Sequence, residues 1–281
     1  MPNLRDFLNE SIFELPSGVE QKIYTVAISN DSHNLILQQF ILALAEYFVI
    51  CWLSPTFGSR DTIWTTWNTG SDDECQDMLQ QLQSAFCDNE GHVADDLDPY
   101  SGKTHAKGNF GETLLRWIEE TFRQEDKRFI PAAPQPSSEG SIDLIETIFL
   151  ANGTWFAILW ECKATRQIAG AVSRAYKQLD DYPNRLYFIA NDRASQFEES
   201  DNSDSQYAQT LRFMPMEAKR RTNRIHYGVL IAHDASEKQP NLRDLHKHPE
   251  DVPPGCHHLI FVALPDFYDL RDAVWRAIRL R

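Results

Sequence analysis

The amino-acid sequence predicts an α/β protein in which a mixed β-sheet is flanked by helices. Two observations indicate this class. Segments with helical periodicity alternate along the 281-residue chain with short apolar runs of β-prone residues. Two of these runs are separated by little more than an Asn-Gly pair at 152–153, which is typical of a β-hairpin and so of an antiparallel pair within the sheet.

Residues 1–100 predict an N-terminal α+β region, followed by a polar stretch at 88–109 rich in Gly, Pro and Asp. The expected elements are a strand and two helices, at 20–29, 33–51 and 72–87. Nine acidic residues and no Lys or Arg occupy 62–98. This acidity makes the N-terminal region a candidate surface for docking a protein partner.

Residues 108–281 predict a second region, in which helices and strands alternate. Its first helix, at 110–124, has Leu114, Leu115, Ile118 and Phe122 on one stripe. The remaining expected elements are strands at 141–150 and 154–163, a helix at 167–181, a strand at 185–190, a helix at 206–222, strands at 226–234 and 258–264, and a helix at 267–279.

Composition favours a cytoplasmic protein with reduced thiols, because the five cysteines form no CxxC pair and the N-terminus is polar. The segment 35–53 approaches the length of a transmembrane helix. Gln38, Gln39 and Glu46 interrupt it, and a carboxylate in the centre of a bilayer is costly. A buried helix is therefore expected here, and no membrane association.

Two charged residues interrupt the end of an apolar strand in the segment AILWECKAT, residues 157–165. Glu161 and Lys163 are two residues apart, so in a strand they point to the same face of the sheet, whereas Cys162 points to the other. Alone, this pair is typical of a surface salt bridge. Its place in an apolar strand, beside a hairpin partner that carries Asp143, favours a functional site.

The length of the hairpin loop decides whether Asp143 faces Glu161. If the loop comprises the three residues 151–153, pairing is symmetrical about Asn152, and Asp143 lies across from Glu161 with Cβ atoms about 5 Å apart. A two-residue loop would place Asp143 on the opposite face, unless a bulge corrected the register. A functional site therefore requires the odd loop or a bulge.

Two carboxylates this close repel each other, which raises the pKa of one of them unless a cation lies between them. Mg²⁺ takes one or two carboxylates and keeps several waters. An ammonium nearby can stabilise the charge that develops on a phosphate. Asp143, Glu161 and Lys163 therefore predict metal-assisted hydrolysis of a phosphodiester, with Mg²⁺ or Mn²⁺ as cofactor.

This pattern resembles the PD-(D/E)xK nuclease superfamily, whose restriction-endonuclease-like core comprises a helix, a three-stranded meander, a second helix and a further strand. The matching segments are GNFGETLLRWIEE, GSIDLIE, WECKAT, AYKQLDDY and RLYFIA. The resemblance implies that Asp143 and Glu161 bind Mg²⁺, that the main-chain carbonyl of Cys162 is a further ligand, and that Lys163 assists the attacking water. Glu112 matches an acidic residue that many members place beside the metal.

Two further segments are expected to contact DNA. Gln178 and Tyr182 are similar to the Gln-x-x-x-Tyr element that members related to recombination exonucleases carry near the substrate; the alternative is a helix end with Tyr182 packed on the sheet. A net charge of −14 excludes general attraction of DNA to the whole surface. One basic segment could contact phosphates, or form a solvated helix face or a partner-binding patch; its residues are Lys219, Arg220, Arg221 and Arg224.

A narrower resemblance links the chain to the nuclease subunit of Hachiman-type anti-phage systems, through FGETLL, EGSIDLIE, WECKAT and HLIFVALPDFYDLRDAV. Those proteins act with a helicase, and this chain has no P-loop motif of its own. The resemblance implies a DNA nuclease that serves in antiviral defence beside a helicase partner.

Two alternatives remain open. A catalytically inactive nuclease fold that regulates or binds other proteins would be favoured if Asp143 lay on the other face from Glu161, or if Lys163 were held in a structural ion pair. A restriction-type, sequence-specific endonuclease would be a homodimer with base-reading side chains, and no recognition module is visible in the sequence.

Overall fold

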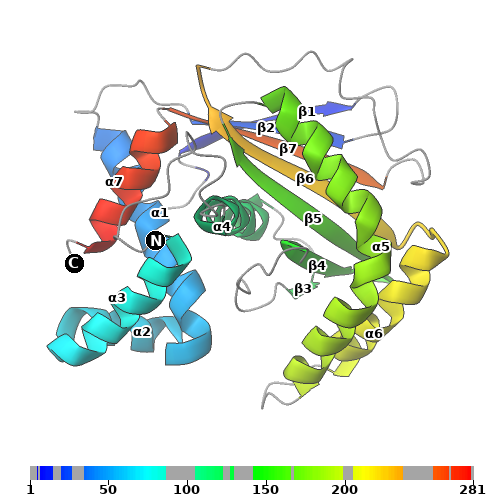
Figure 1. The fold of residues 1–281 in the computed structure, drawn as a ribbon, viewed down its shortest axis with the longest axis horizontal. Helices are drawn as coiled ribbons and strands as arrows, with labels where there is room; N and C mark the ends of the chain where they lie inside the picture. The colour runs from blue at the N-terminus through cyan, green and yellow to red at the C-terminus, as the bar shows by residue number, and fades with distance from the viewer. Residues whose placement is uncertain are drawn as a thin grey trace.

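The chain forms one mixed seven-stranded sheet with helices on both faces, which confirms the predicted α/β class (Figure 1). This computed structural model describes residues 5, 7–14, 20–26, 35–86, 105–122, 127–129, 142–165, 168–198, 205–236, 256–265 and 267–279.

The strands lie in the order β1-β2-β7-β6-β5-β4-β3. The four central strands β2, β7, β6 and β5 are parallel to their neighbours within this set. The outer pairs β1–β2, β5–β4 and β4–β3 are antiparallel. Their bounds are β1 Leu8–Glu14, β2 Glu20–Val26, β3 Lys127–Phe129, β4 Leu144–Phe149, β5 Trp155–Thr165, β6 Ile225–Asp234 and β7 His257–Leu264. The strand β5 is therefore an interior strand, with β4 on one side and β6 on the other.

The helices divide between the two faces of the sheet. Helix α4 packs on one face with α1, α3 and α7 beyond it, and α5 and α6 cover the other (Figure 1). Their bounds are α1 Leu35–Phe57, α2 Arg60–Thr69, α3 Asp72–Phe86, α4 His105–Phe122, α5 Ile168–Glu198, α6 Ser205–Lys219 and α7 Phe267–Arg279.

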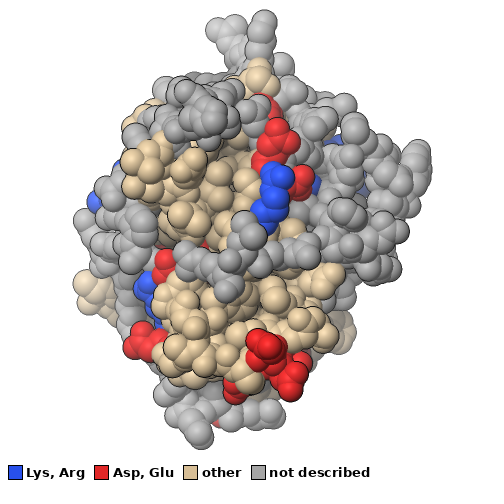
Figure 2. Space-filling model, turned by 90° about the vertical axis from the view of Figure 1, so that its left-hand side faces the viewer, with Lys and Arg blue, Asp and Glu red and all other residues tan. Residues whose placement is uncertain are grey.

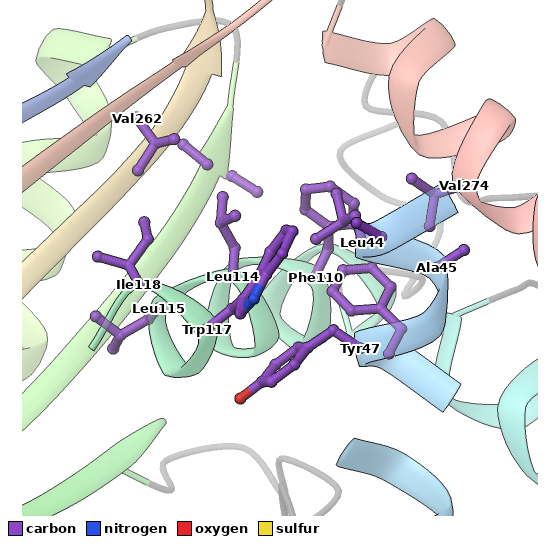
Figure 3. Packing of buried hydrophobic residues seen from close by; sticks show 14 of the residues in the cluster. Leu44, Ala45, Tyr47, Phe110, Leu114, Leu115, Trp117, Ile118, Val262 and Val274 are labelled. Carbon is purple, nitrogen blue, oxygen red and sulfur yellow. The ribbon is translucent and has the colours of Figure 1, made fainter. Parts of the chain in front are cut away.

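Two hydrophobic clusters fill the spaces on either side of the sheet. The larger one joins α4 to α1, α7 and the strands; Leu44, Phe110, Trp117 and Val262 belong to it (Figure 3). The smaller one lies beneath α5 and α6. Because β5 is covered on both faces, it is apolar on both, which explains its continuous hydrophobic run.

The N-terminal region shares this sheet and this core. Strands β1 and β2 extend the sheet beyond β7, and α1 and α3 contribute to the same cluster as α4. Most of the predicted boundary at 88–109 lies outside the described residues.

Helix α1 has the length and composition of a membrane span over Leu37–Ser54, and 56% of that window is buried inside the protein. Such burial is typical of the core helix of a soluble protein and agrees with the predicted buried helix. The described surface on the side of α1, α2, α3 and α7 is largely uncharged, with separate acidic groups and few Lys or Arg (Figure 2).

The predicted strand at 185–190 is wrong, because this segment belongs to the 31-residue helix α5. Proline in a helix interior removes a hydrogen bond, yet α5 continues through Pro183. Leu186 and Ala190 are buried four residues apart, whereas Phe188 between them is 74% exposed. Burial of this helical face in the hydrophobic cluster beneath α5 and α6 outweighs both the proline and the β-prone composition.

Three elements were not predicted: β1, α2 and β3. The strands β1 and β3 lie at the two edges of the sheet, and β3 is only three residues long. Helix α2 buries only Ile63 and Trp67, one turn apart. Each of these elements presents too short an apolar pattern to be recognised locally. Helix α5 continues to Glu198, well past its predicted end at 181, and α1 continues to Phe57 in place of 51. The other predicted elements are present, with ends that differ by a few residues.

Candidate active site

The hairpin of β4 and β5 has the register that the three-residue loop requires. Leu144 pairs with Trp160, and Phe149 pairs with Trp155. Asp143, the residue before β4, therefore lies at the position opposite Glu161. The sequence-based prediction of this register is confirmed.

The loop at 151–153 is closed by two main-chain hydrogen bonds. The N–H of Leu150 donates to the carbonyl of Thr154 at 2.8 Å, and the N–H of Gly153 donates to the carbonyl of Leu150 at 2.9 Å. Gly153 has φ +79°, a conformation that glycine adopts without steric cost. Asn152 accepts a hydrogen bond from the N–H of Thr154 at 3.0 Å. Asn-Gly thus stabilises a longer loop than its usual two-residue turn.

Asp143 takes the place of a main-chain group at the start of β4. Its Oδ2 accepts a hydrogen bond from the N–H of Cys162 at 2.6 Å. If the antiparallel hydrogen-bond pattern of β4 and β5 continued one pair further, the N–H of Cys162 would donate to the carbonyl of Ile142. That carbonyl instead accepts a hydrogen bond from Nη2 of Arg193 at 3.2 Å. The N–H and C=O of one residue point to the same neighbouring strand, so the carbonyl of Cys162 is directed to the side on which Asp143 lies.

Glu161 is buried and accepts hydrogen bonds at both of its carboxylate oxygens. Lys163 Nζ contacts Oε1, and the hydroxyl of Tyr182 donates to Oε2. The Lys163 side chain is 24% exposed, so it connects the buried carboxylate to the surface. This contact confirms that Glu161 and Lys163 share a face, whereas Cys162 lies in the core against α4.

The surroundings of Asp143 disfavour its charged form. Burial, followed by repulsion from Glu161, raises the pKa of Asp143 well above its usual value. The ammonium of Lys163 and the hydrogen bond from Cys162 oppose this rise. Two neighbouring carboxylates thus share one ammonium, and the ammonium does not fully offset the burial of Asp143 and its repulsion from Glu161.

Helix α4 brings Glu112 to the same region from the other face of the sheet. A Cβ added to Gly111 would lie 3.3 Å from Cβ of Cys162, so α4 packs directly against β5 here. Glu112 is buried and accepts a hydrogen bond from Arg116 at 2.9 Å. Burial raises the pKa of Glu112, whereas Arg116 lowers it. Its negative charge adds to the pKa rise of Asp143.

Arg193, and the hydrogen bond of Tyr182 inside the site, were not predicted from the sequence. Both residues lie on α5, eleven residues and therefore close to three helical turns apart, which places them on one face. This spacing is a usable signal only if the helix continues through Pro183. Burial and the nearby acidic groups Asp143 and Glu161 raise the pKa of Tyr182 well above its usual value, so its hydroxyl is a stable donor to Glu161.

Of the predicted DNA-contacting residues, the structure brings Tyr182 to Glu161 but not Gln178 or the basic residues. Gln178 is exposed on α5, one turn before the buried Tyr182. The basic residues lie exposed at the end of α6 and in the turn that leads into β6: Lys219, Arg220, Arg221 and Arg224. The guanidinium of Arg224 lies over the ring of Trp155 at 5.3 Å. Since β5 rises about 3.3 Å per residue, this end of the strand is about 20 Å from Glu161.

The donor set at Asp143, Glu161 and the carbonyl of Cys162 suits a hard cation. All three donors are oxygens, and Mg²⁺ typically binds one or two carboxylates and several waters. A carboxylate oxygen has two lone pairs, so the contacts of Glu161 with Lys163 and Tyr182 leave acceptor capacity. Within the described part of the chain no group of three or more His, Cys, Asp or Glu side chains is placed to hold a metal ion.

No model of a known protein family matches this sequence, and a comparison with curated proteins finds no significant match.

Proposed function

We propose that this protein is a metal-dependent deoxyribonuclease with a PD-(D/E)xK core. The observation that carries the proposal is the placement of Asp143 across from Glu161, with Lys163 on the same face. The order of elements supports it: helix α4, the antiparallel meander of β3, β4 and β5, then α5 and α6, and the parallel strand β6. Here β6 takes the place that the segment 185–190 was expected to fill.

In this proposal Asp143, Glu161 and the carbonyl of Cys162 hold Mg²⁺ or Mn²⁺. The bound cation would lower the pKa of a water and stabilise the charge that develops on the phosphate. Lys163 orients that water through its ammonium and supplies a second positive charge. Tyr182 fixes the carboxylate of Glu161 by a hydrogen bond, and Glu112 keeps the electrostatic potential beside Asp143 negative, which favours a cation there.

We further propose that the nuclease works in the cytoplasm, in antiviral defence, beside a helicase that supplies most of the grip on DNA. The net charge of −14 and the position of the basic residues about 20 Å from Glu161 support a partner protein that binds the DNA. The basic residues at the end of α6 and Gln178 would guide a strand. The acidic first turn of α3, with Asp72, Asp73 and Glu74, would face the partner.

A second candidate function is favoured by one contact. Lys163 forms an ion pair with Glu161, as it would in a nuclease fold that has lost its activity and regulates or binds another protein. A metal ion would compete for the same carboxylate, so activity in the presence of metal separates the two candidates.

The test is cleavage of single-stranded and double-stranded DNA by the full chain with Mg²⁺ or Mn²⁺, and with EDTA. The single strand substitutes for the product of a helicase. We expect Glu161→Gln and Lys163→Ala to abolish cleavage. Glu146→Gln is the matched control, because Glu146 is equally buried on β4 but bonds Trp160 in the cluster on the α4 face. Unchanged cleavage in both site variants would refute the mechanism, and an inactive wild-type protein would support the second candidate.

A further inference from the structure

Arg193 is an enclosed cation beside Asp143 that lacks a carboxylate partner among the described residues. Its Nη2 donates to the carbonyl of Ile142 at 3.2 Å. Its Nε and Nη1 are shielded from solvent and have no hydrogen-bond partner in the part of the chain that the structure describes. Burial lowers the pKa of Arg193, and Glu112 opposes that shift.

The contrast with Arg116 shows that enclosure alone does not explain this arrangement. Arg116 is buried, and it forms an ion pair with Glu112 at 2.9 Å. Arg193 holds only one main-chain carbonyl, which a neutral donor could hold as well. Leaving charged donors without partners in a protein interior costs stability. Such a residue is typical of a site that binds a ligand of opposite charge.

The charges around Asp143 indicate which ligand would suit Arg193. Three carboxylates and three cations balance formally: Asp143, Glu161 and Glu112 against Lys163, Arg116 and Arg193. A divalent cation bound by Asp143 and Glu161 would leave two positive charges in excess. A phosphodiester anion offsets part of that excess, and a guanidinium N–H forms a charge-assisted hydrogen bond with a phosphate oxygen.

We propose that Arg193 binds the DNA phosphate that is presented to Asp143 and Glu161, through guanidinium N–H groups for which the described residues supply no acceptor. This inference rests on the proposed nuclease function. It assigns to α5 a substrate-binding residue, three turns beyond Tyr182, and it makes phosphate binding dependent on the metal.

The experiment uses Arg193→Met, which keeps the length of the side chain and removes the charge. Binding of a fluorescent single-stranded oligonucleotide is measured by anisotropy with Ca²⁺ in place of Mg²⁺, together with the midpoint of thermal unfolding. We expect affinity to fall about 10- to 100-fold, as for the loss of charge-assisted hydrogen bonds. We expect the unfolding midpoint to stay or rise, because an unpaired buried charge has been removed.

A purely structural Arg193 would give the opposite result, namely a lower unfolding midpoint with oligonucleotide affinity within about twofold of wild type, and this would overturn the inference. Arg185→Met is the matched control, since Arg185 is an exposed arginine on the same helix. Its one ion pair in the described chain, with Asp181 at 3.9 Å, is long and exposed. We expect its affinity to change by less than about threefold. Arg193→Lys should recover part of the affinity, because lysine restores the positive charge but not the planar guanidinium group.

The outcomes separate this inference from the proposed function. Oligonucleotide binding that depends on Arg193, without cleavage by the wild-type protein, would refute the nuclease and keep the phosphate site. Cleavage with equal rates in wild type and Arg193→Met would keep the nuclease and refute the site. A wild-type protein that neither binds the oligonucleotide in Ca²⁺ nor cleaves it with Mg²⁺ would overturn both.

Discussion

Tyr182 on α5 donates a hydrogen bond to Glu161 on β5, and this contact couples the helix that covers the sheet to the carboxylate that the hairpin presents. Both side chains are about 1% exposed. Because Lys163 occupies the other oxygen, the orientation of Glu161 is determined by groups from two elements.

We expect Tyr182→Phe to impair the site more than the fold. The substitution removes one hydroxyl and leaves Oε2 of Glu161 without this donor, which costs about 1–3 kcal/mol in a buried position. Cleavage should require more Mg²⁺ for half-maximal rate, because the carboxylate is no longer fixed. A metal titration of the cleavage rate and urea denaturation measure the two effects. Tyr176→Phe, on the same helix and against His257, should leave the metal requirement unchanged.

The stability of the metal-free protein should depend on the protonation of Asp143. Its pKa is raised in the folded state, so the folded protein binds a proton that the unfolded chain has released. This contribution to stability is therefore present below the raised pKa and is lost as pH rises through it. Urea denaturation in EDTA, at pH values from about 4 upward, should show this loss in the wild-type protein. Asp143→Asn should flatten that part of the profile, and an unchanged profile would contradict the assignment.

Divalent metal should stabilise the folded protein through Asp143 and Glu161. A ligand that binds only the folded state at 100 times its Kd adds about 2.7 kcal/mol to the free energy of unfolding. We expect Mg²⁺ or Mn²⁺ to raise the midpoint of thermal unfolding of the wild-type protein and of Glu146→Gln. Asp143→Asn and Glu161→Gln should show no such rise. A rise of equal size in these two variants would place the metal elsewhere.

Gly228→Ala should disturb β5 next to the site. A Cβ at position 228 would lie 2.2 Å from the ring of Trp160, the residue before Glu161. The ring must move, and overpacking of this kind costs about 1–3 kcal/mol. Chemical denaturation should show this loss, together with reduced cleavage. Gly170→Ala is the control, because its nearest contact is the flexible end of Arg174 and alanine favours the helix.

The sequence by itself determined the sheet class, most of the elements and the register of the hairpin. These are local properties, because alternation defines a strand and the length of one loop determines which residues pair across it. Asp143 and Glu161 could therefore be placed opposite each other by counting from Asn152. Glu112 was predicted by resemblance alone, and in the structure its charge contributes to the raised pKa of Asp143.

Only the tertiary structure decided what surrounds these carboxylates. The segment after Pro183 has a local preference for a strand, and only burial of Leu186 and Ala190 in the cluster beneath α5 and α6 makes it helical. That helix brings Tyr182 to Glu161 and Arg193 to Ile142, contacts across 21 and 51 residues of chain. No periodicity of sequence encodes such pairs, because they depend on how a helix crosses a sheet, and that crossing is determined by packing of the whole core.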